Sequence, residues 1–237
     1  MVFLLIMMFC ASPVVHSQVP EWYIPLRDAI YEQELSADAV APIYQTVSNR
    51  AKMTLSGYDQ YILLSRCEYI MGKAYLYEER RSEASARFED GMAFARRAIE
   101  ARETADAWVM LGENLSQNIA ALSSNVFYAM GNGLDVEKFA RNALALNPRS
   151  ASAQFLIAAR WVYAPFPFNN IRRGIDLLNA IITTSDMDKA NTFDVYSSLG
   201  YAYVQQRNSA QARLWLNRSL ELYPTNKFVA SLLAGLR

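Results

Sequence analysis

The residues from Phe193 to Asn226 read FDVYSSLGYAYVQQRNSAQARLWLNRSLELYPTN, and this stretch decides the fold. In its first half, Tyr196, Leu199 and Tyr203 recur at intervals of three and four residues, which is typical of a helix with one buried face. Pro224 closes the second half, because proline cannot continue a helix. The stretch therefore predicts two helices joined by a short turn.

Small residues stand where these two helices must approach each other closely, Gly200 in the first and Ala212 in the second. Numbered from Phe193, the apolar, small and proline residues fall at places 4, 7, 8, 11, 20, 24, 27 and 32 of a 34-residue unit. This spacing resembles the tetratricopeptide repeat (TPR), a helix–turn–helix unit of that length. Ser219 departs from the family's usual Ala, but Ser is small enough to fit.

Weaker copies of the unit lie upstream, where Met71-Gly72 and Leu111-Gly112 match the Leu199-Gly200 pair. The resemblance implies an all-α fold, a right-handed α-solenoid of degenerate TPR repeats with helical caps at both ends. The expected parts are a signal peptide at 1–17, an N-terminal helical cap at 18–64, the solenoid at 65–226 and a C-terminal capping helix at 227–237. Within the solenoid, the repeats are expected near residues 65–104, 105–148, 151–186 and 193–226.

Two repeats are longer than the family norm. Residues 81–102 fit the second-helix spacing in two registers one heptad apart, which predicts one continuous helix. Apolar residues follow Ser116, so the first helix of the second repeat is expected to continue to Met130 and to stop at Gly131-Asn132-Gly133. We expect its far end to pack on the long helix of the first repeat. The N-terminal cap, in which Ser36 is a predicted N-cap, is expected to cover the first repeat.

The N-terminus reads as an export signal. An apolar run from Val2 to Phe9 is followed by small residues, which suits cleavage after Ser17. We therefore expect an exported, periplasmic protein of a bacterium. An uncleaved membrane anchor and acylation of Cys10 remain open alternatives, although the bulky Phe9 before this cysteine disfavours a lipoprotein site.

Cleavage there would remove His16, the single histidine, and leave Cys67 as the single cysteine. Such a mature chain has no internal disulfide and no histidine for a Ser-His-Asp or Cys-His pair, or for a zinc or haem site. The sequence also lacks a Gly-rich phosphate loop and a metal-ligand spacing, so we expect a non-enzymatic protein without cofactor or metal.

The charge and hydropathy exclude further classes. Lys and Arg together number 23, as do Asp and Glu, so nothing favours nucleic acid as a partner. With 52% apolar and 19% charged residues, the chain is neither disordered nor a membrane bundle.

In the family that this chain resembles, the first helix of each repeat lines a concave groove that binds partners. Tyrosine suits such a surface, since it supplies a large contact area at low entropic cost. The resemblance also turns Asp194 of the fourth repeat inward. The alternative is that the aromatic residues only fill the superhelix axis. The expected groove residues are Arg66, Tyr69, Lys73, Tyr77, Asp106, Glu113, Gln117, Phe155, Tyr163, Tyr201 and Gln205.

The loop at residues 164–170 is a second candidate site. Pro165 and Pro167 forbid helix there, and Phe166 and Phe168 are then either an exposed hot spot or a seal on the neighbouring helices. The sequence does not separate these two interpretations.

The favoured function is a scaffold or adaptor that binds a protein or peptide partner in the groove. The alternative is a periplasmic small-ligand-binding or transporter-associated TPR component. A third hypothesis is self-association through the long helix of the second repeat.

Overall fold

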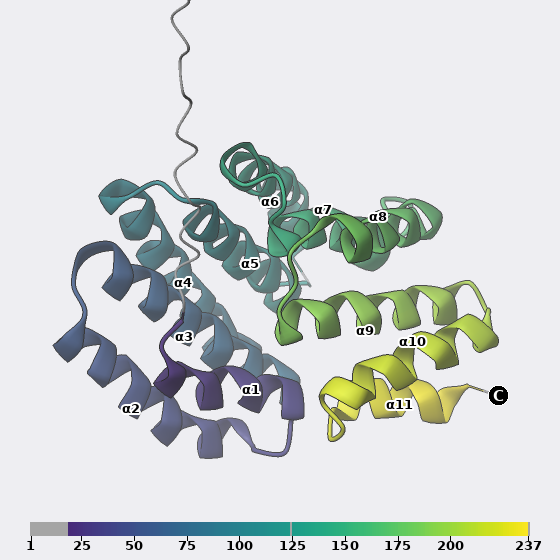
Figure 1. Cartoon of the computed structure of the whole chain (residues 1–237), viewed down its shortest axis with the longest axis horizontal. Coiled ribbons are helices and arrows are strands. Elements are labelled where there is room, and N and C mark those ends of the chain that lie inside the picture. The colour runs from purple at the N-terminus through teal and green to yellow at the C-terminus, as the bar shows by residue number, and fades with distance from the viewer. Residues whose placement is uncertain (1–18, 124, 237) are drawn as a thin grey trace, which may run out of the picture.

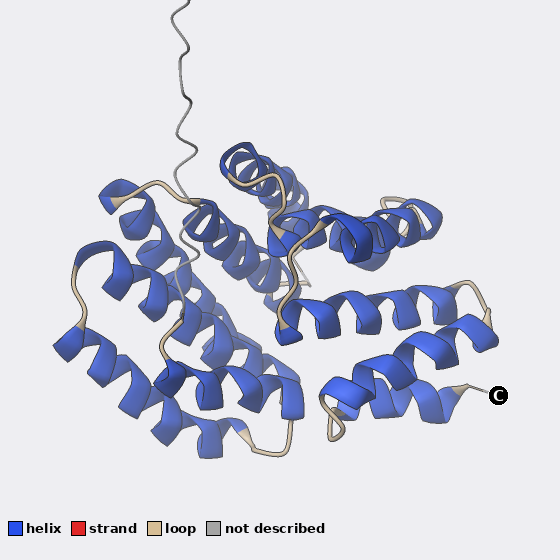
Figure 2. Ribbon diagram, viewed as in Figure 1, coloured by secondary structure: helices blue, strands red, loops and turns tan. Residues whose placement is uncertain are grey.

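The computed structural model describes residues 19–123 and 125–236, and the expected signal peptide lies outside them. The described residues form helices and connecting loops, with one isolated bridge between Ser150 and Asp186 and no named strand (Figure 2). The all-α fold class is therefore confirmed.

Successive helices pack on each other in pairs along the chain (Figure 1). A short 3-10 helix at Glu21–Tyr23 precedes the first of them. The pairs are α1 (Ile24–Glu32) with α2 (Ala37–Thr54), α3 (Gly57–Tyr77) with α4 (Arg81–Ala101), α5 (Ala105–Ala121) with α6 (Val126–Leu146), α7 (Ala151–Tyr163) with α8 (Ile171–Thr184), and α9 (Lys189–Gln205) with α10 (Ser209–Leu222). The last helix, α11 (Lys227–Gly235), packs on α10.

Side-chain caps mark where many of these helices begin. The Ser36 hydroxyl accepts a hydrogen bond from the Ala39 amide at the start of α2, as predicted. Thr104 caps α5 and Ser150 caps α7 in the same way, through the amides of Ala107 and Ala153. The helix starts therefore follow from local polar residues that satisfy otherwise unpaired amides.

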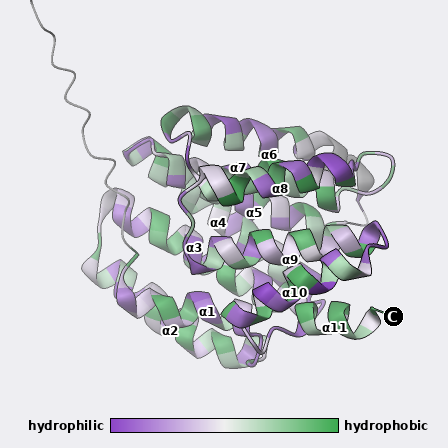
Figure 3. Cartoon of the chain, turned by 45° about the vertical axis from the view of Figure 1, so that its right-hand side comes forward, coloured by the Kyte–Doolittle hydropathy of each residue, from purple (hydrophilic) through white to green (hydrophobic). Residues whose placement is uncertain are grey.

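Polar and apolar residues alternate along most helices, so each helix has a buried and a solvated face (Figure 3). The predicted continuous helix of the first repeat is confirmed, since α4 runs unbroken from Arg81 to Ala101.

The predicted long helix from Ala105 to Met130 is wrong. The chain turns after Ala121. The side chain of Asn125 caps a new helix by accepting a hydrogen bond from the Tyr128 amide. Asn125 is a strong N-cap residue, whereas Gly131-Asn132-Gly133, the predicted stop, lies inside α6. The end of α5 does pack on α4, because Ala121 contacts Ala84 and Phe88 there.

The N-terminal helices do more than cover the first helix pair. Leu26, Ile30 and Tyr31 of α1 belong to the same buried core cluster as Phe193 of α9 and Tyr223 after α10. Helix α1 therefore joins the first helix pairs to the last one, and this closure positions the site described next.

Candidate functional site

The predicted groove residues lie on alternate helices. Helix α3 carries Arg66, Tyr69, Lys73 and Tyr77, α5 carries Asp106, Glu113 and Gln117, α7 carries Phe155 and Tyr163, and α9 carries Tyr201 and Gln205. Several of them act on one another electrostatically across helices, as the following contacts show.

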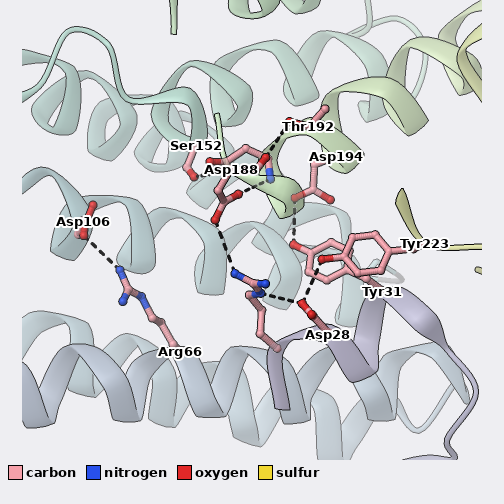
Figure 4. Close-up of polar contacts among 11 residues, drawn as sticks. Asp28, Tyr31, Arg66, Asp106, Ser152, Asp188, Thr192, Asp194 and Tyr223 are labelled. Carbon is pink, nitrogen blue, oxygen red and sulfur yellow. Dashed lines mark hydrogen bonds and ion pairs between the residues drawn. The ribbon is translucent and has the colours of Figure 1, made fainter. Parts of the chain in front are cut away.

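An ion pair sets the register between α3 and α5. The Arg66 guanidinium lies 3.1 Å from the Asp106 carboxylate (Figure 4). Lys73 and Glu113 stand seven residues further along the two helices, which is two turns on and the same face. They should meet as Arg66 and Asp106 do, but no ion pair joins them.

Lys73 is surrounded by tyrosine rings instead. Its Nζ lies 5.4 Å from the ring centroid of Tyr31, 5.4 Å from that of Tyr69 and 5.7 Å from that of Tyr77. Burial alone would lower the pKa of this ammonium, but Tyr69, Tyr77 and Asp194 raise it above its ordinary value. Lys73 is therefore a cation at neutral pH, held by the faces of the rings.

Glu113 has no hydrogen-bond or ion-pair partner among the described residues, although its side chain is half-buried. Burial raises the pKa of its carboxyl to about 8, and Asp194 adds to the rise by repulsion. Lys73 and Arg66 act in the opposite direction but do not cancel the burial. An acid that is largely neutral at pH 7 thus lies within the electrostatic reach of Lys73.

Asp194 lies opposite, on α9. The Tyr31 hydroxyl donates a hydrogen bond of 3.1 Å to its carboxylate (Figure 4). Burial raises the pKa of Asp194 to about 6, while Lys73 and the Tyr31 hydrogen bond lower it. The charge of Asp194 is also one of the causes that raise the pKa of Glu113.

A pair of tyrosines flanks Asp194. The rings of Tyr163 and Tyr201 stack with centroids 5.1 Å apart, and the Tyr163 hydroxyl shares a hydrogen bond of 2.8 Å with Ser198. Tyr201 also approaches Phe228 of α11, at 6.3 Å between centroids. We call Tyr31, Tyr69, Lys73, Tyr77, Glu113, Tyr163, Asp194 and Tyr201 the inner cluster.

The inner cluster is surrounded by protein and yet reached by solvent. Tyr163 keeps 45% of its surface exposed, but burial is the largest cause that raises the pKa of its hydroxyl. Tyr163 therefore has one part of its surface open to solvent and its hydroxyl surrounded by protein atoms.

Helix α1 closes the chain around this cluster. Arg27 lies 2.8 Å from Asp28 and 3.7 Å from Asp188, and the Tyr223 hydroxyl donates to Asp28 at 3.0 Å (Figure 4). Backbone groups of α1 take part too, since the Asn226 side-chain amide donates to the Tyr31 carbonyl at 2.6 Å. The two ends of the described chain are therefore tied together.

Other predicted residues stay outside the inner cluster. Phe155 packs into the core shared by α7, α8 and α9, which is the filling role that the sequence left open. Gln205 is exposed at the end of α9, and neither it nor Gln117 makes a side-chain hydrogen bond among the described residues.

The aromatic loop between α7 and α8 is exposed. Phe166 keeps 88% of its surface accessible and Phe168 keeps 55%, so the two rings do not seal the neighbouring helices. The loop is held at its base, where the Asn170 amide donates to the Trp161 carbonyl at 3.0 Å.

A surface pocket of about 540 Å³ opens where α1, α3 and α11 meet. Ala29, Ile30, Val40 and Ala74 line it together with the half-exposed Tyr77 of the inner cluster. Its other lining residues are Gln33, Glu34, Leu35, Ser36, Glu78, Lys227 and Phe228.

Cys67 is fully buried on α3, and burial raises the pKa of its thiol. A buried thiol of raised pKa is a core residue rather than a nucleophile. In the part of the chain that the structure describes, no group of His, Cys, Asp and Glu side chains is placed to hold a metal ion.

Sequence reasoning did not include Tyr31 in the site. The expected repeat spacing could not reveal it, because α1 lies outside the expected repeats and reaches the inner cluster only through contacts with the end of the chain. Asp194 was expected to turn inward, and its contact with Tyr31 is a tertiary result.

No protein-family model matches the chain, and a search of curated proteins finds no significant match. None of the described helices combines the length and the hydropathy needed to cross a membrane.

Proposed function

We propose that this chain is a non-enzymatic scaffold or adaptor that binds a protein or peptide segment against its inner cluster. The observation that carries the proposal is the set of partly exposed tyrosines that converge from α3, α7 and α9 around unpaired charges. Tyrosines of this kind supply contact area and hydrogen bonds at low entropic cost.

The repeat interpretation supports the proposal. A Cβ added to Gly200 would lie 2.4 Å from Leu216, and one added to Gly72 would lie 2.5 Å from Phe88. In both repeats the glycine at place 8 thus meets the large residue at place 24 of its partner helix. We propose on this ground a TPR-like α-solenoid of right-handed twist, exported to the periplasm as the N-terminal sequence suggests.

The exposed loop supports an open binding protein as well. Phe166 and Phe168 form a second aromatic surface outside the inner cluster. Aromatic side chains presented on an anchored loop are typical of protein contacts.

A small-ligand-binding component is the second candidate, and the pocket of about 540 Å³ beside Tyr77 favours it. Its volume falls in the range of about 300–1,000 Å³ that ligand sites occupy. Its rim carries Glu34, Glu78 and Lys227, so a ligand there would be at least partly polar.

The test is a crosslinking pull-down from the organism that encodes the chain, with the wild type and a Tyr69→Ala/Tyr77→Ala/Tyr201→Ala variant. A matched control replaces Leu146 and Leu214, two exposed residues outside the inner cluster, by Ala. Circular dichroism establishes that each variant is folded.

A partner that is lost from the tyrosine variant and kept by the leucine control supports binding at the inner cluster. An unchanged partner set overturns it, and a Phe166→Ser/Phe168→Ser variant then tests the loop as the binding surface.

A further inference from the structure

The charges of the inner cluster are arranged as if one positive group were missing. Arg66 and Asp106 neutralise each other at 3.1 Å. Lys73 then faces two acids, Glu113 and Asp194, and forms an ion pair with neither among the described residues. Glu113 is largely neutral at pH 7, so the excess of one negative charge arises when a bound cation brings both acids to their ionised form.

Lys73 is held where it cannot readily form an ion pair with either acid. Three tyrosine rings hold its ammonium, and Tyr31 is itself fixed by its hydrogen bond to Asp194. Each cation–π contact stabilises the ammonium where it lies, so three rings resist a move of Lys73 toward the acids.

Glu113 shows the cost of the missing charge most clearly. It is half-buried and has no ion-pair partner among the described residues, and burial raises its pKa to about 8, so it is largely neutral at pH 7. Asp194 has one partner, the neutral Tyr31 hydroxyl, and keeps acceptor capacity for a second donor.

Aromatic faces complete the site. Tyr163 and Tyr201 stack on each other, Asp194 acts electrostatically on Tyr163, and Tyr163 shares a hydrogen bond with Ser198, one turn beyond Asp194 on α9. Carboxylates next to electron-rich rings recognise alkylammonium and guanidinium groups.

We infer that the inner cluster binds a cationic group, the side chain of a Lys or Arg in a peptide partner, between Glu113 and Asp194 and against Tyr163 and Tyr201. The inference rests on the proposed function, since it names the chemistry of the partner at the same site. A free alkylamine offers the same group, and the experiment separates the two sources.

The probe is an array of random heptapeptides, to which binding of the labelled full chain is measured. Each peptide that contains lysine is also synthesised with Nε-acetyl-lysine in its place. Putrescine is titrated separately by calorimetry. We expect bound peptides to carry Lys or Arg, and acetylation to weaken their binding about tenfold or more, since it removes the positive charge and its charge-assisted hydrogen bonds.

Three variants make the test specific. Glu113→Gln should abolish the sensitivity to acetylation, whereas Glu89→Gln, on the exposed face of α4, should keep it. Lys73→Met removes the competing positive charge and should tighten the cationic peptides, a direction that a merely structural role of Lys73 would not produce.

Binding should also strengthen as the pH rises from 6 to 8 in the wild type and not in Glu113→Gln, because the cation requires the ionised acid. The charged groups that act on Glu113 here are Asp194, Lys73, Arg66 and Asp106, and the hydroxyls of Tyr23, Tyr31 and Tyr69 also lie within its electrostatic reach.

The remaining outcomes separate the cationic site from the adaptor function. Peptides that bind equally with and without acetylation overturn the cationic site and leave the adaptor function standing. Putrescine binding without peptide binding keeps the cationic site and overturns the adaptor function. Binding of neither probe overturns the inference.

Discussion

The Tyr31 hydroxyl donates a hydrogen bond of 3.1 Å to the Asp194 carboxylate, although 163 positions of sequence separate the two residues. Tyr31 also presents its ring to Lys73 and stacks on Tyr223, with centroids 4.9 Å apart. One side chain of α1 therefore takes part both in the closure of the chain and in the inner cluster.

Tyr31→Phe should lower the free energy of unfolding by about 2 kcal/mol, because it removes a hydrogen bond to a charged group and keeps the ring. It should also raise the pKa of Asp194, since this hydrogen bond lowers it. Urea denaturation measures the first effect and an NMR titration of the Asp194 carboxyl the second. Tyr61→Phe is the control, as the half-buried Tyr61 hydroxyl has no partner among the described residues. Equal losses in both variants would contradict the contact.

Asn226→Ala should destabilise the chain more than Asn208→Ala does. Both asparagines cap a helix, Asn226 through the Val229 amide and Asn208 through the Gln211 amide, and a lost cap costs about 1 kcal/mol. Asn226 is only 2% exposed and also donates a hydrogen bond to the Tyr31 carbonyl, so Asn226→Ala should lower the free energy of unfolding by about 1–2 kcal/mol more than Asn208→Ala does. Thermal denaturation of the two variants compares them, and similar melting temperatures would mean that this contact does not stabilise the closure.

Glu113→Gln should change how stability depends on pH. The pKa of Glu113 is raised from 4.5 to about 8 in the folded chain, so the folded state binds more protons than the unfolded state between these values. The contribution of Glu113 to the free energy of unfolding is fully present below pH 4.5 and is lost as the pH rises to about 8. Asp194 changes the free energy of unfolding in the same direction, between pH 3.8 and about pH 6.

Urea denaturation at several pH values measures this effect. Glu113→Gln should flatten the decline of the free energy of unfolding above pH 6, because it removes the titrating group and leaves a neutral side chain of similar shape. The exposed Glu89→Gln should retain the wild-type slope. A wild-type stability that rises with pH over this interval would contradict the placement of Glu113.

Gly200→Ala should lower the free energy of unfolding by about 1–3 kcal/mol, because the added Cβ would lie 2.4 Å and 2.6 Å from Leu216 side-chain atoms. Gly131→Ala should act in the opposite direction, by up to about 1 kcal/mol. Gly131 lies inside α6, and its added Cβ would meet no atom within 4 Å. Chemical denaturation measures the change in the free energy of unfolding for each variant. No change in Gly200→Ala would mean that the close helix contact does not support the repeat interpretation.

Much of the fold could be predicted because helix starts, stops and faces depend on neighbouring residues. Ser36 caps α2, α4 runs without a break, and Gly200 allows two helices to approach closely, all as the sequence indicates. The exception is the end of α5, where an apolar run favoured a helix to Met130. The Asn125 cap started a new helix there, and periodicity alone does not distinguish one long helix from two that share a face.

The candidate site could be predicted only in part. The helical period predicts that Lys73 and Glu113 face the same way as Arg66 and Asp106. It does not predict that Arg66 and Asp106 form an ion pair at 3.1 Å while Lys73 and Glu113 do not, since that depends on the tyrosines around Lys73. One of these tyrosines comes from α1, outside the expected repeats.

The helical character and most helix boundaries follow from the sequence alone, because caps, glycines, prolines and apolar spacing act over a few residues. Only the tertiary structure decided that α1 returns to the end of the chain and brings Tyr31 to Asp194 and Lys73. Contacts between segments so far apart depend on the summed geometry of every helix pair between them, and no local pattern contains that sum.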